Sequence, residues 1–360
     1  MTMVNSDPAQ LDAAWMTGAL EHAGVARGAA VTAVEFAGYI GTGQTGRNGR
    51  FHLTWDDPAG RPSSVVAKFP SGDPVARANA FENGTYVTEY AFYEKVAHTV
   101  DIRVPEMFVA HFDETVKDFV FVMEDLSGSR QGDQIVGLTP EEAALAVEQA
   151  VGLHAPRWGD PTLPDFVTHR ASGEERAIQL ATMYGMCTEP FLDRLGSRLD
   201  PDVVDLVRAI GPHFVPWLIA VSETPSTMIH LDFRPDNFLF GVEDGAPPLV
   251  VVDWQTAADG NAMMDLGYMI GGSFEPAQRA AVEADLLRDY VARMNGRGVD
   301  YGWDVAWRDY RLGALWGVVM TVIATILAAE TERGNDMLTV MAQRHGRHSL
   351  DLDTLGLLGG

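Results

Sequence analysis

The spacing of apolar residues changes near residue 126 of the 360-residue chain. Before that point, short runs of β-type residues alternate with glycine-rich turns and predict strands at 31–40, 50–55, 64–69, 107–111 and 118–123. Residues 86–100 predict a helix, because Tyr86, Tyr90, Tyr93, Ala97 and Val100 form an apolar stripe at helical spacing. We therefore expect a β-rich first part.

Beyond residue 126 the apolar positions recur mainly at helical spacing. The predicted helices span 140–154, with Thr139 as its cap, and 173–194, 201–221, 276–295 and 303–330. Short strands are predicted between them at 227–231, 237–241 and 248–253. The pattern thus predicts an α+β protein with a small β-rich lobe, residues 1–124, and a larger, mainly helical lobe, residues 125–360.

One apolar stretch resembles a membrane span. Eighteen uncharged residues separate Arg311 from Glu330, whereas a span needs about 20. The stretch contains Thr321 and Thr325 and has no aromatic belt, which favours a buried helix of the helical lobe. The first residues show no signal-peptide pattern, and the one cysteine excludes an intrachain disulfide, so we expect a cytoplasmic protein.

The composition excludes some partners. Hydrophobic residues make up 46% of the chain, which is enough for a large core, and the net charge is -24. An acidic surface disfavours nucleic acid and anionic membranes. The charge would suit a cationic substrate, although a solvated acidic surface is the simpler interpretation.

Gly41, Gly43 and Gly46 lie between the first two predicted strands. Glycines let the backbone approach phosphates and present N–H groups to them. A plain hairpin turn is also glycine-rich, so this pattern is weak alone. A strand rather than a helix follows, which favours a kinase-type phosphate lid over a dinucleotide-binding fold.

Lys68 stands out because the chain has three lysines against twenty-three arginines. It lies in a predicted strand among apolar residues, where a compact ammonium could reach nucleotide phosphates. The alternative is an edge-strand lysine that prevents aggregation. Glu89 lies at the edge of the helical stripe and is the expected partner of Lys68; Glu94 is the rival on the more polar side.

Three oxygen-bearing side chains carry the strongest chemical signal. Asp232 lies in an irregular loop, Asn237 follows five residues later, and Asp253 ends an apolar run. Phosphoryl transfer from a magnesium nucleotide needs one carboxylate at the attacking hydroxyl and an amide and a second carboxylate at the metal. The spacing allows one hairpin between the two acids, so we expect them at neighbouring strand ends. Ordinary turn formation is the alternative for each residue singly.

The motifs around these residues resemble the aminoglycoside phosphotransferase and choline-kinase-like enzymes, which are relatives of protein kinases. The matching segments are 230–237, 252–255 and the residues from Asp265 onward. The resemblance covers about 30–300, strongly only at 227–270. It implies a bilobal, protein-kinase-like fold and transfer of the γ-phosphoryl group of MgATP to a hydroxyl of a small molecule.

The resemblance also implies residue roles. Asp232 would be the catalytic base, Asn237 and Asp253 the magnesium ligands, and Lys68 with Glu89 the pair that orients the phosphates. The resemblance also implies a hinge beside the nucleotide base. This hinge would consist of Met123, Glu124, Asp125 and Leu126.

Two supporting residues follow from the same resemblance. Asp265 would brace the catalytic loop, and His154 would serve packing rather than chemistry. The chain departs from the family at Leu231, where a glycine is usual, and at 259–261, where Gly-Asp-Pro is frequent.

Two other functions remain open at this stage. A nucleotide-binding pseudokinase that acts by binding a partner would not need all the polar catalytic residues. A protein kinase is disfavoured because no Ala-Pro-Glu segment follows Asp253. The sequence does not choose between ATP and GTP, between an aminoglycoside, choline-like, macrolide or acyl acceptor, or between oligomeric states.

Overall fold

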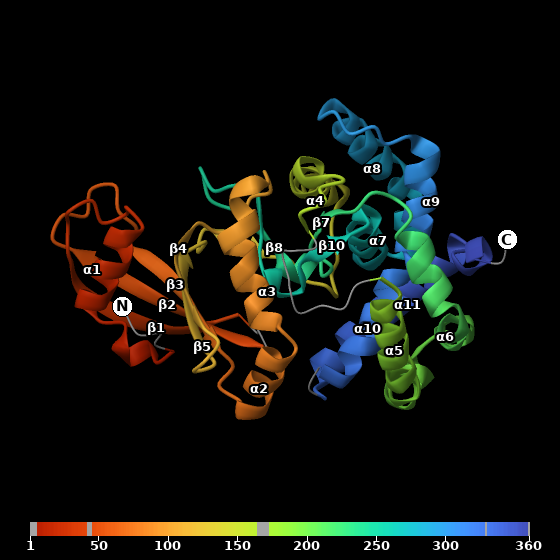
Figure 1. Ribbon diagram of the computed structural model, residues 1–360, viewed down its shortest axis with the longest axis horizontal. Helices are drawn as coiled ribbons and strands as arrows, with labels where there is room; N and C mark the ends of the chain where they lie inside the picture. The colour runs from red at the N-terminus through yellow and green to blue at the C-terminus, as the bar shows by residue number, and fades with distance from the viewer. Residues whose placement is uncertain (1–5, 42–44, 164–172, 328–329, 359–360) are drawn as a thin grey trace. The chain divides into compact units, whose positions relative to one another are not determined.

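The computed structural model describes residues 6–41, 45–163, 173–327 and 330–358. The chain forms two compact units, each taken by itself below (Figure 1). The first comprises Met1–His98, Val104–Ser129 and Val252–Gln255, and the second Thr99–Arg103, Arg130–Val251 and Thr256–Gly360. A single boundary at residue 124, as predicted from the sequence, would assign 252–255 to the other part of the chain.

The first unit contains an antiparallel sheet ordered β1-β2-β3-β5-β4. Its strands are β1 Val31–Ile40, β2 Gly46–Trp55, β3 Ser64–Pro70, β4 Met107–Asp113 and β5 Asp118–Glu124. All five coincide with or extend the predicted strands. The helices of this unit include α1 Ala13–His22 and α2 Pro74–Glu82, neither of which the periodicity predicted.

The two faces of this sheet pack against different helices. Phe51, Ala67 and Val122 on one face join Met16 and Leu20 of α1 in a single apolar core. The other face carries Phe119 and Phe121, which pack with Tyr86 of α3 Thr85–Ala91. Figure 1 shows α1 and α3 on opposite sides of the sheet. Lys68 lies in β3, where its neighbours on either side belong to the first core.

The helix predicted at 86–100 does not stay an α-helix. It becomes a π-helical turn at Phe92–Val96 and a 3-10 turn at Ala97–Thr99. Phe92, the first residue of the wider turn, is fully buried and stacks on Trp254 with ring centroids 3.8 Å apart. This contact fixes Phe92 at the change of pitch, and such π-turns are frequent at functional sites.

The second unit is mainly helical. Its helices are α4 Pro140–His154, α5 Gly173–Leu195, α6 Pro201–Val221, α7 Ala262–Ser273, α8 Pro276–Gly296, α9 Trp303–Gly313, α10 Leu315–Leu327 and α11 Glu332–Asp351. Helix α4 has the predicted bounds and begins with a capping box between Thr139 and Glu142. The helices α7 and α11 were not predicted.

The single helix predicted at 303–330 is two helices that meet at Ala314. A β-carbon on Gly313 would lie 2.3 Å from the carbonyl oxygen of Met263, so α7 approaches the chain very closely there. Beyond the break, Leu315, Val319 and Val322 are buried in the helical core. The apolar stretch before Glu330 therefore contributes a core helix, as expected.

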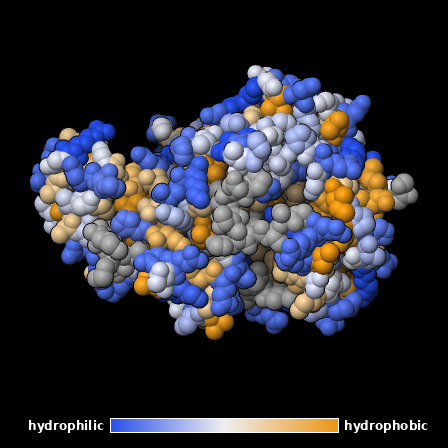
Figure 2. Space-filling model, viewed as in Figure 1, coloured by the Kyte–Doolittle hydropathy of each residue, from blue (hydrophilic) through white to orange (hydrophobic). Residues whose placement is uncertain are grey.

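One described helix, α6, is long and apolar enough to cross a membrane by length and composition. It buries residues at helical spacing, among them Val203, Val207, Ile210 and Trp217, in the same helical core. Core helices of soluble proteins pass this test too. On the face shown in Figure 2, hydrophobic residues form separate patches among hydrophilic ones.

The short strands predicted at 227–253 do not form one sheet. The strand β7 Thr227–Ile229 pairs with β10 Ala258–Gly260, whereas β8 Phe238–Gly241 lies between β6 Ser129–Gln131 and β9 Leu249–Val251. The expectation that Asp232 and Asp253 follow neighbouring strands is wrong, because β7 and β9 belong to different sheets. The missing information was the pairing of β7 with a later strand.

Candidate functional site

A buried charged cluster in the first unit joins three segments of the chain. The Lys68 Nζ donates to both Glu89 oxygens, at 2.8 and 2.6 Å. It also lies 3.5 Å from Oδ1 of Asp253. Lys68 and Glu89 are 8% and 2% exposed, whereas the Asp253 side chain is 32% exposed. The pairing of Lys68 with Glu89 rather than Glu94 agrees with the sequence-based choice.

The charges around Lys68 keep it protonated. Burial alone would lower its pKa, but Glu89 first and Asp253 second outweigh that effect, and the pKa lies above its ordinary value. The positive charge of Lys68 balances only one of the two carboxylates that it contacts, so this cluster keeps a net negative charge. Asp253 is the accessible member of the cluster and can therefore contact a further cation.

Asp253 itself adopts an uncommon backbone conformation. Its φ is 69°, in the left-handed region, which Asp tolerates better than most residues. Gln255 Nε2 donates to Asp253 Oδ2 at 3.3 Å, and the Gln255 Oε1 accepts from the Thr45 hydroxyl at 2.6 Å. Within this unit the segment 252–255 is thus tied to the residue that precedes β2.

Gly46, the first residue of β2, lies close to Lys68. Gly41 has a φ of 74°, and a β-carbon on Gly46 would lie 3.1 Å from Lys68 Cε. The Thr45 carbonyl accepts a hydrogen bond from the Tyr86 hydroxyl. Gly43 lies outside the described residues. A β-carbon on Gly46 would also lie 3.1 Å from the Phe69 carbonyl oxygen, so glycine at position 46 leaves room for the Lys68 side chain and for the neighbouring strand.

The register of the sheet aligns further side chains with Lys68. Asn48 and Phe121 pair with Lys68, and Arg50 and Met123 pair with Val66 in the next row. Directly paired residues point to the same face of a sheet. Two rows of side chains therefore lie on one face of the sheet. The first contains Lys68, and the second, which contains Val66 and Met123, lies nearer to the residues that follow β5.

The segment that follows β5 carries an ion pair that the sequence did not suggest. Arg50 on β2 binds Asp125 with two contacts, Nε to Oδ2 at 2.9 Å and Nη2 to Oδ1 at 3.0 Å. The Asp125 side chain is almost fully buried. Glu124 accepts through Oε2 from the Glu106 N–H at 3.1 Å, and Leu126 follows directly.

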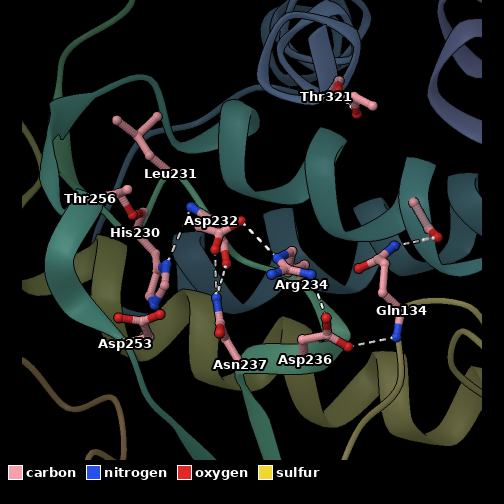
Figure 3. A network of polar contacts seen from close by, with 12 residues as sticks. Gln134, His230, Leu231, Asp232, Arg234, Asp236, Asn237, Asp253, Thr256 and Thr321 are labelled. Atoms are coloured by element: carbon pink, nitrogen blue, oxygen red, sulfur yellow. Dashed lines mark hydrogen bonds and ion pairs between the residues drawn. The ribbon is translucent and has the colours of Figure 1, made fainter. Parts of the chain in front are cut away.

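A second polar cluster lies within the second unit, after β7 (Figure 3). Asp232 Oδ1 accepts from Nε of Arg234 at 2.9 Å, and its Oδ2 accepts from Nδ2 of Asn237 at 2.9 Å. Asn237 Nδ2 also donates to the Asp232 carbonyl at 2.8 Å. Because the amide nitrogen faces Asp232, the Asn237 side-chain oxygen is available for another ligand.

Asp265 holds the backbone that leads into this cluster. Its carboxylate accepts from the N–H groups of His230 and Leu231, both at 2.7 Å. His154 Nε2 lies 3.2 Å from Asp265, and His154 Nδ1 lies 2.8 Å from the Tyr290 hydroxyl. His154 and Asp265 are both fully buried. His154 thus supports Asp265, a contact that its place at a helix end did not reveal.

The two clusters contain oxygen donors of the type that magnesium prefers. Asn237 offers an amide oxygen and Asp253 a carboxylate. The described residues contain no group of three or more His, Cys, Asp or Glu side chains gathered for a metal. The Asn237 and Asp253 oxygens are each of the kind that a magnesium ion accepts beside waters and phosphate oxygens.

Sequence reasoning missed Arg234, Asp236 and Arg50. Arg234 Nη1 donates to Asp236 Oδ2 at 2.6 Å, so the guanidinium joins two acids. The signal was present as alternating acid, base and acid at 232, 234 and 236. Arg50 had no comparable signal, because its partner is distant in the sequence.

Comparison with known proteins gives a family and a fold. The model of the phosphotransferase enzyme family (APH) matches residues 45–303. No curated protein matches the chain. Among solved structures, it is similar to the GDP complex of aminoglycoside 2'-phosphotransferase-IIIa, with a TM-score of 0.53 and 16% identity over 88% of this chain and 93% of that chain.

A second similar structure is choline kinase from Cryptosporidium parvum Iowa II, with a TM-score of 0.53 and 10% identity over 90% of each chain. An ethanolamine kinase from Plasmodium vivax has a TM-score of 0.52 and 10% identity over 86% of this chain and 82% of that chain. At these identities the likeness shows the fold. It confirms the predicted α+β, protein-kinase-like architecture.

Proposed function

Because the chain belongs to the phosphotransferase enzyme family, we propose that it is a small-molecule kinase that transfers the γ-phosphoryl group of MgATP to a hydroxyl group. The observation that carries the proposal is the buried Lys68, paired with Glu89 at 2.6 Å and close to the accessible Asp253. Burying the charges of Lys68 and Glu89 is costly, and a site that binds polyphosphate and a cation accounts for that cost.

Lys68 is proposed to bind the α- and β-phosphate oxygens while Glu89 fixes its side chain. The backbone N–H groups of the turn at Gly41–Gly46 would contact the same phosphates. The nucleoside would lie along the side chains of Val66 and Met123, towards the hinge at 123–126. These positions follow the two rows of side chains on the Lys68 face of the sheet.

Asn237 and Asp253 are proposed to hold magnesium through their side-chain oxygens. When bound, this ion would neutralise charge on the phosphate oxygens. Asp232 is proposed to accept the proton of the acceptor hydroxyl, a role that contributes about 10²–10⁴-fold in other enzymes. Arg234 and Asn237 each donate a hydrogen bond to one oxygen of its carboxylate.

The acceptor is proposed to be a hydroxylated small molecule that carries an amine. Structures with this fold include enzymes named for aminoglycoside, choline and ethanolamine. The net charge of -24 would favour such a cation. ATP is the proposed donor and GTP the second candidate, since a structure of the same fold is a GDP complex.

The test is a nucleotide diphosphate release assay with ATP or GTP, with and without Mg²⁺, over a panel of hydroxylated amines. Asp253→Ala should abolish metal-dependent turnover and leave the thermal midpoint near that of the wild type. Asp244→Ala is the matched control, because Asp244 is an exposed residue of the β8–β9 loop. Full activity of Asp253→Ala would overturn the metal assignment.

A matched lysine pair tests the phosphate assignment. Lys68→Met should weaken nucleotide turnover at least about 10²-fold, whereas exposed Lys95→Met should not. Nucleotide binding by the wild type without turnover on any acceptor would instead support the pseudokinase alternative.

A further inference from the structure

We propose that Arg234 is a positioning residue that holds the carboxylate of Asp232 in its working orientation, with Asp236 as the anchor of the guanidinium. The inference rests on the proposed function, because it assigns Asp232 the role of base. Beyond that function, it assigns a shared role to the segment 232–236, in which an acid, a base and a second acid occupy alternate positions.

The contacts of Arg234 form a clamp across this segment (Figure 3). Its Nε donates to Asp232 Oδ1 at 2.9 Å, and its Nη1 donates to Asp236 Oδ2 at 2.6 Å. The rigid planar fork of arginine presents these donors in fixed directions, which the single ammonium of lysine does not. One side chain thereby sets the distance between two carboxylates.

The clamp acts on both oxygens of Asp232 together with Asn237. Arg234 engages Oδ1, and Asn237 Nδ2 engages Oδ2 at 2.9 Å. A carboxylate held at both oxygens cannot rotate about its terminal bond without breaking one contact. A base must meet the acceptor hydroxyl at hydrogen-bond distance, and a displacement of about 1 Å can cost about 10²-fold in rate.

Asp236 connects the clamp to rigid elements of the same unit. Its Oδ1 accepts from the backbone N–H of Gln134 at 2.8 Å. Gln134 Nε2 donates to the carbonyl of Gly272 in α7 at 2.9 Å, and Arg344 in α11 donates to the Gln134 carbonyl at 3.1 Å. Gly132 also lies so close to Pro235 that a β-carbon would meet its carbonyl oxygen at 2.3 Å.

The contacts of Arg234 differ from those of an ordinary surface salt bridge, because its side chain is mostly buried. The Arg234 side chain is 19% exposed, and surface pairs of this kind contribute little. A guanidinium this far from water has lost much of its hydration and needs its acids. The same shielding keeps both contacts strong, so the orientation of Asp232 persists in water and salt.

Steady-state kinetics with Arg234→Gln, Arg234→Lys and Asp236→Asn test the proposal. Arg234→Gln should lower kcat about 10–100-fold with KM for nucleotide and acceptor changed less than about twofold. Asp236→Asn, which leaves Arg234 in place, should lower kcat less. The double variant Arg234→Gln/Asp236→Asn should be no slower than Arg234→Gln, because both changes break one clamp.

Arg333→Gln is the matched control, because exposed Arg333 binds Asp133 beside Gln134 and its replacement should leave kcat unchanged. Arg234→Lys keeps the charge without the fork and should recover only part of kcat. The proposal would be overturned if Arg234→Gln kept the wild-type kcat, or if the losses of kcat were additive in the double variant. It would also be overturned if the thermal midpoint fell so far that partial unfolding accounted for the loss of kcat.

A readout independent of turnover separates this proposal from the proposed function. In protein labelled with ¹⁵N-arginine, the Arg234 Nε–H signal is identified by its loss in Arg234→Lys. Its hydrogen exchange should accelerate about tenfold or more in Asp232→Asn, which weakens a charge-assisted bond. Unchanged exchange in Asp232→Asn would refute the clamp. If exchange accelerates in Asp232→Asn but the wild type shows no turnover, the clamp is supported and only the proposed activity is refuted.

Discussion

Leu231 offers a direct measure of the forces that shape the loop before Asp232. Its φ is 65°, a left-handed conformation that favours glycine. Yet its side chain is only 6% exposed and belongs to the helical core. Its N–H donates to Asp265 at 2.7 Å, and its carbonyl accepts from the indole of Trp316 at 2.9 Å. Backbone strain and side-chain burial therefore oppose each other at one residue.

The magnitudes of these two effects predict the order of two variants. Removing the buried side chain in Leu231→Ala should cost about 2–5 kcal/mol, the range for core Leu→Ala changes. Leu231→Gly loses the same contacts but relieves about 1–2 kcal/mol of left-handed strain. Glycine adds an unfolded-state entropy cost of roughly 0.5–1 kcal/mol. The glycine variant should therefore be less stable than wild type but more stable than the alanine variant by roughly 0.5–1 kcal/mol.

Urea denaturation at 25 °C, followed by tryptophan fluorescence, gives this comparison for wild type and both variants. A matched pair at an unstrained core position, Val319→Ala and Val319→Gly in α10, should show the usual order, with alanine the more stable. If alanine were also the more stable residue at position 231, the strain assigned to Leu231 would be absent. If the glycine variant exceeded wild type, burial of the leucine would not be what stabilises the loop.

Two further predictions concern pH and nucleotide choice. Burial lowers the pKa of His345 well below its ordinary value, and nearby charges including Arg344 lower it further, so the unfolded chain binds a proton below about pH 6.5 that the folded protein does not. The free energy of unfolding should thus fall from pH 7 to pH 5. In His345→Gln this fall should be less steep than in the wild type by up to about 1.4 kcal/mol per pH unit; equal slopes in the two proteins would refute the prediction. Arg50→Gln should free Asp125 to accept from the N–H groups of guanine and raise kcat/KM for GTP relative to ATP about fivefold to tenfold; an unchanged ratio would show that Asp125 does not face the base.

The secondary structure was predictable where periodicity and end signals agree. The strand Val31–Ile40 and the helix Pro140–His154 have the predicted bounds, since a run rich in β-branched and aromatic residues marks one and the Thr139 cap marks the start of the other. Helix α7 was not predicted because all its residues are buried, so it has no polar face to create a period. The break at Ala314 was equally hidden; it follows Gly313, whose close approach to Met263 is a tertiary contact that the apolar spacing does not reveal.

The candidate site was predictable to the extent that its residues are chemically unusual. Lys68 stood out in a chain poor in lysine, and Glu89 followed as the acid at the edge of the apolar stripe of the helix predicted at 86–100. Arg234 is one of twenty-three arginines and lies in a loop without period. The alternation of acid, base and acid at 232, 234 and 236 hinted at its ion pairs, but their geometry depends on the fold of the loop.

The departure at Leu231 and the brace at Asp265 explain each other. A leucine in the left-handed region needs its conformation imposed from outside, and two backbone N–H groups held by one buried carboxylate impose it. His154 contacts the same carboxylate, so part of its charge is balanced within the core. Such bracing fixes the chain direction just before Asp232, and the Arg234 clamp then fixes the side chain. Backbone and side chain of the proposed base are thus held by separate groups of contacts, which is why the two can be perturbed independently.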